Sequence, residues 1–444
     1  MSPIPDPVPA DTDVPRATEV AIIGGGIIGV CASLKLAEQG IPVTLLEKGE
    51  IAAEQSSRNW GWCRQQGRDP REMPLIIESL NLWREMSARI QQDVGFNECG
   101  VLALAQSDTD LEKHRDWSSL GQEYGVESKL LGGTGVAQYI PGCATVWTGG
   151  LYTPSDGRAE PTLAAPAIAL AARRLGAKIF TNTAVRAIDI QAGRVNGVVT
   201  EHGRIRCNTV IVAAGAWTSP FLRNLGIRLP QLKVRSSAFR THPLPGGPEV
   251  SIYASGFAVR KRADGGYTIA LGGRTRIPYD ITPDSFRYVR DFLSLAWMSR
   301  KSLRLRLSGR FLTEQRYASR WDHQQPTMFE EERILNPAPV VKLLQQAQRN
   351  IATAIPSFEN LSVAERWAGM IDVTPDAIPV ISEAVGLPGC VIATGFSGHG
   401  FGIGPAAGEF AAHLALGQQP VVDPAPFRLQ RFSDGSPITP IAGI

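Results

Sequence analysis

Three glycines near the start of the chain, Gly24, Gly26 and Gly29, form a G-x-G-x-x-G motif. The motif directly follows an apolar run, Val20–Ile23, and precedes small and apolar residues at helical spacing. Glu47 ends a second apolar run, which predicts the next strand. In this order the glycines let the backbone approach a pyrophosphate, and the carboxylate accepts hydrogen bonds from ribose hydroxyls. The pattern therefore predicts a dinucleotide-binding unit.

The loop after the second predicted strand favours FAD over NAD. It carries a hydroxyl pair, Ser56 and Ser57, beside Arg58, and these side chains are suited to hold a second phosphate. Gly61 would let a flat isoalloxazine ring approach the backbone closely. The alternative interpretation is a polar capping loop.

Two later segments rich in small residues fit the needs of a flavin enzyme. A three-stranded meander is predicted over 184–190, 195–200 and 206–213, and small residues follow it. A strand over 390–394 then leads into a glycine-rich loop over 395–404, after which a helix begins. The start of that helix would face the negative charge that develops on a reduced flavin.

The chain contains no second G-x-G-x-x-G motif with its own acidic residue. A separate nicotinamide domain is therefore not expected. The electrons would then come directly from a small-molecule substrate, which indicates an oxidase or dehydrogenase.

At these residues the chain resembles the D-amino-acid oxidase superfamily of FAD enzymes, which includes sarcosine oxidases and amino-acid dehydrogenases. The resemblance runs from Val20 to about Phe432. The loop 51–58, the segment 345–382 and the closing segment 424–432 look like those of bacterial L-amino acid deaminases. By contrast, the motif Thr-Gly-Phe-Ser-Gly-His-Gly-Phe that begins at Thr394 is closer to the sarcosine-oxidase form.

The resemblance implies an α/β (α+β) fold with two domains. A Rossmann-like FAD-binding domain would be assembled from 16–88, 155–228 and 366–432. A substrate domain with a large mixed sheet would comprise 89–154 and 229–365, with a basic amphipathic insertion over about 280–325. Residues 1–15 are expected to be a disordered lead-in.

FAD is expected to bind without a covalent link, because Gly369 matches the position where sarcosine oxidases carry the attaching cysteine. The residues expected to contact FAD are Gly24, Gly26, Ile27, Ile28, Gly29, Glu47, Lys48, Gln55, Ser56, Ser57, Arg58, Gly61, Val185, Ala214, Gly215, Trp217, Gly369, Gly398, Gly400, Phe401 and Gly402.

A carboxylate substrate calls for an arginine, whose planar fork makes two parallel hydrogen bonds. Arg274 is the first candidate, because it follows a predicted hairpin near the position where the deaminases carry their carboxylate clamp. Arg64 and Arg260 are the next candidates. A surface arginine is the alternative interpretation of each.

Other residues could line the substrate pocket. Trp62, Tyr253 and Phe396 could form an aromatic wall, although aromatic side chains are more often part of an ordinary core. Trp62 stands where a glutamine lines the pocket of the deaminases, so its presence bears on which substrate fits. His399 lies in the glycine-rich loop and could touch flavin or substrate.

The leading functional hypothesis is oxidative deamination of L-amino acids. The family chemistry moves a hydride from the α-carbon to flavin N5, and the resulting imine is hydrolysed to a 2-oxo acid and ammonia. One alternative is oxidation of secondary amines or of D- or imino acids, in which case the chain could be one subunit of a complex. A non-redox dinucleotide-binding protein is the alternative outside the enzymes.

Composition excludes several classes of protein. Lys plus Arg number 45 and Asp plus Glu 42, for a net charge of +3, which argues against a nucleic-acid binder. The six cysteines are scattered, so neither a metal site nor a disulfide framework is expected. No apolar run approaches the roughly 18 residues that span a bilayer, and no secretory signal is present. These features favour a cytoplasmic enzyme.

The segment 286–320 is unusually basic, with nine Lys or Arg against two acidic residues among many apolar ones. A solvated surface excursion is one interpretation. The other is peripheral contact with anionic lipid at the inner face of the membrane, where reduced flavin could pass electrons to a quinone instead of oxygen.

Overall fold

The computed structural model describes residues 2–273, 277–317 and 319–440. Its first large element is a six-stranded sheet in which one edge strand is antiparallel and the others are parallel. In spatial order the strands are β20 (Val380–Glu383), β21 (Cys390–Thr394), β12 (Thr209–Val212), β1 (Val20–Ile23), β2 (Val43–Leu46) and β8 (Lys178–Phe180). The central strands are buried and almost wholly apolar, as expected for a parallel sheet with both faces covered.

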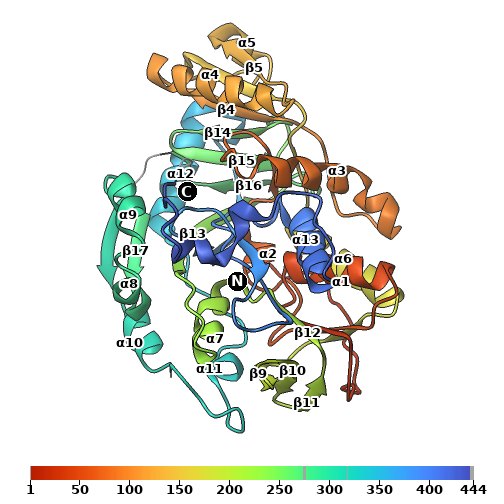
Figure 1. The fold of residues 1–444 in the computed structure, drawn as a ribbon. Coiled ribbons are helices and arrows are strands. Elements are labelled where there is room, and N and C mark those ends of the chain that lie inside the picture. Colours follow the sequence, from red (N-terminus) through yellow and green to blue (C-terminus); the bar gives the residue numbers. More distant parts are fainter. Residues whose placement is uncertain (1, 274–276, 318, 441–444) are drawn as a thin grey trace.

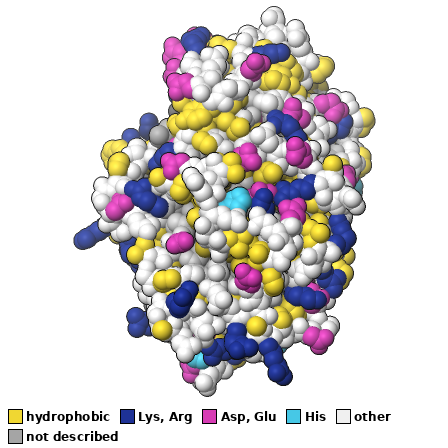
Figure 2. All heavy atoms as spheres, turned by 45° about the vertical axis from the view of Figure 1, so that its right-hand side comes forward, with side chains coloured by type: hydrophobic (Ala, Val, Ile, Leu, Met, Phe, Trp, Pro, Cys, Tyr) yellow, Lys and Arg dark blue, Asp and Glu magenta, His cyan; other side chains and the backbone are white. Residues whose placement is uncertain are grey.

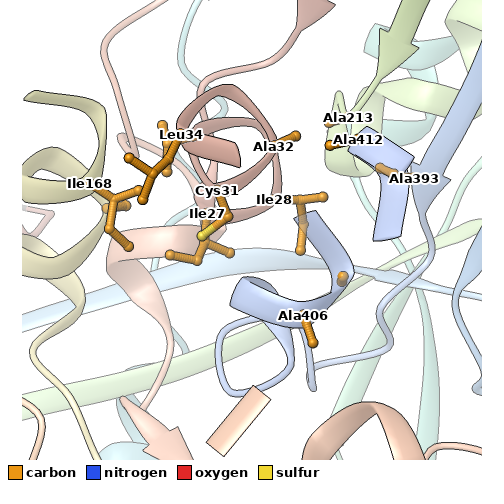
Figure 3. Close-up of a cluster of buried hydrophobic side chains, with 14 of the residues drawn as sticks. Ile27, Ile28, Cys31, Ala32, Leu34, Ile168, Ala213, Ala393, Ala406 and Ala412 are labelled. Carbon is orange, nitrogen blue, oxygen red and sulfur yellow. The ribbon is translucent and has the colours of Figure 1, made fainter. Parts of the chain in front are cut away.

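Helix α1 (Ile27–Glu38) packs between α6 (Pro161–Arg174) and α13 (Gly404–Ala415), as Figure 3 shows. Small side chains allow this close approach: a Cβ added to Gly408 of α13 would lie 2.5 Å from the Cβ of Cys31. Helix α3 (Met73–Ile90) packs beside α13. These helices hold the turn that follows β1 in place.

The second large element is an eight-stranded mixed sheet (Figure 1). The α/β fold with a large mixed sheet, predicted from the sequence, is thereby confirmed. In spatial order its strands are β19 (Val363–Val373), β13 (Leu232–Thr241), β16 (Tyr267–Ala270), β15 (Phe257–Lys261), β14 (Ser251–Ala254), β4 (Val101–Ala105), β6 (Gly149–Thr153) and β5 (Lys129–Gly132). Helix α12 (Val341–Ala354) packs on it, and α4 (Asp108–Glu123) and α5 (Gly133–Ala137) lie at its outer end.

Smaller elements complete the fold. One sheet contains β9 (Val185–Gln191), β10 (Arg194–Thr200) and β11 (Gly203–Arg206), and another contains β3 (Trp62–Cys63) and β7 (Gly157–Arg158). The short helices are α2 (Gln55–Arg58), η1 (Gly215–Trp217), α7 (Thr218–Asn224), α11 (Met328–Glu331), η2 (Pro356–Phe358), η3 (Ala425–Phe427) and η4 (Leu429–Phe432).

The meander differs from its prediction at the third strand. The expected strand over 206–213 is two strands, β11 and β12, and only β11 pairs with β10. β12 instead joins β1 in the six-stranded sheet. The chain turns at Cys207 and Asn208, and no glycine or proline marks that change of sheet in the sequence.

The predicted basic insertion forms a separate layer at one edge of the molecule (Figure 1). Strand β17 (Ile277–Ile281) pairs in parallel with β18 (Leu303–Leu307), and α8 (Pro283–Arg287), α9 (Leu293–Ser299) and α10 (Gly309–Gln315) surround them. Figure 2 shows a face of the molecule on which acidic and basic side chains are interspersed. None of the helices in the described ranges is both long and apolar enough to cross a bilayer.

The lead-in differs from the disordered segment that we expected. The Asp6 amide donates to the Thr162 carbonyl over 2.9 Å, and the Asp11 carboxylate accepts from the Ile179 amide over 2.9 Å. Val8 is buried in the core of the six-stranded sheet. The polar, proline-rich composition conceals these long-range contacts.

The two large sheets match the two domains that the sequence predicts. The strands of the six-stranded sheet come from the three segments that we assigned to the FAD-binding domain. β19 crosses the boundary expected at residue 366, because this strand pairs along its whole length with β13 of the substrate sheet. The division itself remains a proposal.

Replacing Gly408 by alanine tests the packing of α13 on α1. The added Cβ would overlap the Cβ of Cys31 and the backbone of Ala32, so we expect a loss of about 1–3 kcal/mol in the free energy of unfolding. Urea unfolding followed by circular dichroism measures it. Gly309→Ala is the control, because no atom lies within 4 Å of the added Cβ there. Equal stability of both variants would contradict the packing argument.

Candidate active site

A cavity that opens to solvent lies at the carboxyl ends of the parallel strands. Ile23 at the end of β1, Leu46 at the end of β2 and Ala213 just after β12 line it. Open parallel sheets bind ligands at this edge, because the loops that leave the strands diverge there. The topology therefore places the loops singled out in the sequence around one space.

The three glycines of the motif are each required by a close contact. Gly24 has φ +109°, and a Cβ there would lie 2.4 Å from the Ala213 carbonyl oxygen. At Gly26 a Cβ would come within 3.0 Å of the Ser56 hydroxyl, on the cavity wall. Gly29 lies behind the wall, where a Cβ would be 2.0 Å from the Gly24 oxygen. The motif therefore brings both the turn and α1 against the cavity.

Glu47 stands at the cavity wall just beyond β2. Its carboxylate accepts hydrogen bonds from the amides of Gly25 and Gly49, each over 2.7 Å. Burial raises the pKa of Glu47, although the neighbouring Lys48 and these amides act in the opposite direction. The carboxylate is thus held beside the glycine turn, where the sequence predicts a ribose.

Only part of the predicted phosphate loop faces the cavity. Ser56 lines it, and its hydroxyl accepts from the Ile27 amide over 2.9 Å. The Ser57 hydroxyl donates to the Glu54 carbonyl, and Arg58 donates to the carbonyls of Leu335 and Ala368. Arg58 therefore holds α2 against β19, away from the cavity wall. Burial lowers its pKa.

Besides Gly29, three predicted glycines lie outside the cavity wall. A Cβ at Gly61 would meet the Arg260 side chain at 2.9 Å, and one at Gly402 would meet the Trp62 carbonyl at the same distance. A Cβ at Gly369 would lie 2.1 Å from the Gln55 Oε1. Protein contacts therefore account for each of these glycines.

Most of the residues predicted to contact FAD meet at the cavity. Those that line it are Gly24, Gly26, Ile27, Ile28, Glu47, Lys48, Gln55, Ser56, Val185, Ala214, Gly215, Trp217, Gly398, Gly400 and Phe401. Phe396, predicted at the substrate, also lines it.

Several lining residues were not predicted. Phe329 and Arg333 come from the chain that returns after the insertion, and no motif marks them. Lys48 holds this returning segment at the cavity, because its Nζ donates to the carbonyls of Glu332 and Arg333.

Asp372 of β19, also missed, orders the glycine-rich loop. Its carboxylate accepts from the Gly395 amide over 2.7 Å and from the Thr394 hydroxyl over 3.2 Å. Burial raises the pKa of Asp372, while these hydrogen bonds oppose that shift. A lone aspartate in a strand gives no sequence signal of this role.

His399 points away from the cavity wall within the same loop. Its Nδ1 lies 3.1 Å from a carboxylate oxygen of Glu72 on the far side. Burial and the nearby Arg68 lower the pKa of His399, so the neutral imidazole predominates near pH 7. The contact fastens the loop to the segment that precedes α3.

The candidate substrate residues Trp62, Arg64 and Tyr253 lie together. The Trp62 and Tyr253 rings meet edge to face with centroids 6.3 Å apart, and the Arg64 guanidinium lies 5.6 Å from the Trp62 ring centroid. The Trp62 Nε1 is buried without a hydrogen-bond partner in the described ranges. Arg274 lies outside the described residues.

Arg260 does not fit its predicted role as a carboxylate clamp. It is 1% exposed, and its two terminal nitrogens donate to Glu160 over 2.6 and 3.1 Å. Its Nε donates to the Trp60 carbonyl over 2.5 Å. The guanidinium nitrogens that would bind a substrate carboxylate are therefore already bonded to Glu160 and the Trp60 carbonyl. Arg260 instead positions the loop that contains Trp60.

The cavity fits a flavin dinucleotide. The glycine turn leaves a space along the backbone that a Cβ at Gly26 would narrow. Helix α1 begins at the edge of this space. The Gln55 Oε1 at the wall is buried without a protein hydrogen-bond partner in the part of the chain described. These features suit a long ligand with both phosphates and polar ring edges.

Comparison with solved structures shows close likeness to deaminases. The structure of L-amino acid deaminase from Proteus myxofaciens in complex with anthranilate has 31% identity and a TM-score of 0.93, covering 98% of each chain. L-amino acid deaminase from Proteus vulgaris has 28% identity and a TM-score of 0.91, covering 96% of this chain and 100% of that one.

Curated relatives extend the likeness to amine oxidation. Mitochondrial sarcosine dehydrogenase of Homo sapiens is 24% identical over 430 residues, which is 94% of this chain and 42% of that protein. The chain spans less than half the length of the first curated relatives that it matches. The model of the family DAO, FAD dependent oxidoreductase, matches residues 19–414. Because this match covers most of the chain, the protein belongs to the DAO family of FAD-dependent oxidoreductases.

Proposed function

We propose that the protein uses noncovalently bound FAD to deaminate amino acids, chiefly L-amino acids, to 2-oxo acids and ammonia. The observation that carries the proposal is the likeness to two L-amino acid deaminases over nearly the whole chain. The cluster of Trp62, Arg64 and Tyr253 supports it, because a cation beside aromatic rings suits an amino acid.

The chain's own residues would bind and orient both partners. The glycine turn, Glu47 and Ser56 would hold FAD, which supplies a hydride acceptor at N5 when bound. Arg64 would pair with the substrate carboxylate, and the buried Trp62 indole would donate a hydrogen bond and exclude water. Arg274 would be a second clamp for a carboxylate. A desolvated site disfavours the ammonium form, which keeps the reacting amine neutral.

Oxidation of secondary amines is the second candidate. The likeness to sarcosine dehydrogenase favours it, and so does the sarcosine-oxidase form of the glycine-rich loop. The two candidates differ in their products, since only primary amino acids release ammonia.

Acid precipitation of the purified yellow protein tests how FAD is held. We expect the colour to remain in the supernatant, because Gly369 offers no thiol at the position matching the attaching cysteine. The absorption spectrum of the supernatant measures it. Colour that stays in the pellet would contradict noncovalent binding.

Anaerobic bleaching of the flavin spectrum tests the reaction. We expect L-amino acids to bleach the protein and release ammonia, and Arg64→Met to raise the half-saturating concentration about tenfold or more. Anthranilate, which the Proteus myxofaciens deaminase holds in its structure, should shift the unbleached spectrum. Arg84→Met is the control, because Arg84 pairs with Glu98 at the surface. Bleaching by N-methyl amino acids alone would favour the second candidate.

We also propose that the insertion makes peripheral contact with anionic lipid. Its outer side exposes large apolar residues: Phe286, Leu293, Trp297, Leu305, Leu307 and Leu312 are each 61–72% exposed. Exposed arginines lie among them, and such a surface suits the inner face of the membrane. A membrane quinone would then be the electron acceptor, with oxygen as the alternative.

Sedimentation with phosphatidylglycerol vesicles tests this contact. Replacing Trp297 and Leu305 together by serine should lower vesicle binding about tenfold or more, because both side chains would lose apolar burial. Val146→Ser is the control, since Val146 is 95% exposed outside the insertion. If the unaltered protein does not sediment with these vesicles, the proposed lipid contact is wrong.

A further inference from the structure

Two arginines beside the candidate substrate wall have no carboxylate partner in the part of the chain that the structure describes. Arg64 donates from Nη1 to the Gln66 carbonyl. Arg68 is 4% exposed, donates from Nε to the Arg64 carbonyl over 3.2 Å, and has a buried Nη1 without any partner. The buried Arg68 guanidinium is therefore incompletely hydrogen-bonded, and the partly buried Arg64 lies beside it.

Other deeply buried arginines bond in two ways: Arg58 and Arg158 donate to backbone carbonyls, whereas two more are paired with carboxylates. Arg260 forms a bidentate pair with Glu160, and Arg431 forms one with Asp376. A buried charge without a counter-ion is costly, because water and a compensating anion are both missing. Charged groups with perturbed environments cluster at functional sites, where a ligand can supply the missing charge.

The nearest carboxylates are occupied elsewhere. Glu72 contacts Nδ1 of His399, and Asp156 accepts from the amides of Gln65 and Gln66 over 2.6 and 3.2 Å. Neither forms a salt bridge with Arg64 or Arg68. Burial raises the pKa of Asp156 to about 6, so it keeps most of its charge at pH 7, and both carboxylates attract the two guanidinium groups at longer range. Because neither carboxylate bonds directly to these groups, their hydrogen-bonding capacity stays open to an external anion.

Burial and the adjacent Arg64 lower the pKa of Arg68 to about 9. Arg68 therefore stays mostly charged at neutral pH. Mutual repulsion between the two cations would be relieved by an anion shared between them.

The position of Arg64 and Arg68 indicates which anion could bind between them. Arg64 lies over the Trp62 ring, and Trp62 meets Tyr253, so the pair borders the wall assigned to the substrate. One α-carboxylate brings a single negative charge and needs one guanidinium fork. A second unpaired guanidinium beside the first suits a second carboxylate on the same substrate.

We propose that Arg68, beside Arg64, forms an anion subsite for a side-chain carboxylate, so that dicarboxylic amino acids are the preferred substrates. The inference rests on the proposed function, in which Arg64 holds the α-carboxylate.

Anaerobic bleaching with matched substrate pairs tests the subsite. L-glutamate and L-aspartate should bleach the flavin at least about tenfold more efficiently than L-glutamine and L-asparagine, because the amides keep the shape and lose the charge. Arg68→Met should abolish this preference, and Arg68→Lys should retain part of it. Arg84→Met, at the surface, should keep the preference of the unaltered protein.

Calorimetric binding of glutarate and its monoamide, with and without FAD, gives a readout independent of turnover. We expect glutarate to bind more tightly than the monoamide, and the difference to disappear in Arg68→Met; if that variant does not fold, Arg68→Lys must narrow the difference. If acids and amides bleach the flavin with equal efficiency and bind with equal affinity, the subsite is overturned, even if L-amino acids bleach the flavin. Arg68-dependent glutarate binding without bleaching by any amino acid would overturn the proposed function and leave the subsite standing.

Discussion

The close approach of backbone segments around the glycine turn is the constraint on which the rest of the structure depends. A side chain at Gly24 would strike the chain after β12, and one at Gly29 would strike the turn itself. α1 in turn packs against Gly408 of α13, without room for a Cβ. Three distant parts of the chain therefore meet at a place where hardly any atom can be added, and the cavity opens beside it.

Buried carboxylates then orient the loops that surround the cavity. Asp372 holds the start of the glycine-rich loop, Glu72 holds His399 within it, and Asp156 holds the loop that carries Arg64. Each carboxylate accepts hydrogen bonds from another segment, which offsets the cost of its burial. The loops are thus ordered before any ligand binds, as preorganised binding requires.

The insertion is connected to the cavity as well as to the surface. Its outer side exposes apolar residues, whereas the chain that returns from it contributes Phe329 and Arg333 to the cavity wall. Lys48 fastens this return by hydrogen bonds to two carbonyls. The chain that follows this insertion therefore lines the predicted cofactor site.

The sequence by itself determined the parts whose physical requirements are local. A turn that needs glycine, a buried apolar strand and a helix start are encoded by neighbouring residues, so the motif at Gly24, the strands β1 and β21 and about half of the cavity lining were predictable. Only the tertiary structure decided that Arg260 is taken by Glu160, that Arg58 turns toward β19 and that Arg68 stands without a carboxylate partner among the described residues. The partner of a charged side chain depends on segments far apart in the chain, and no local pattern records which of them fold together.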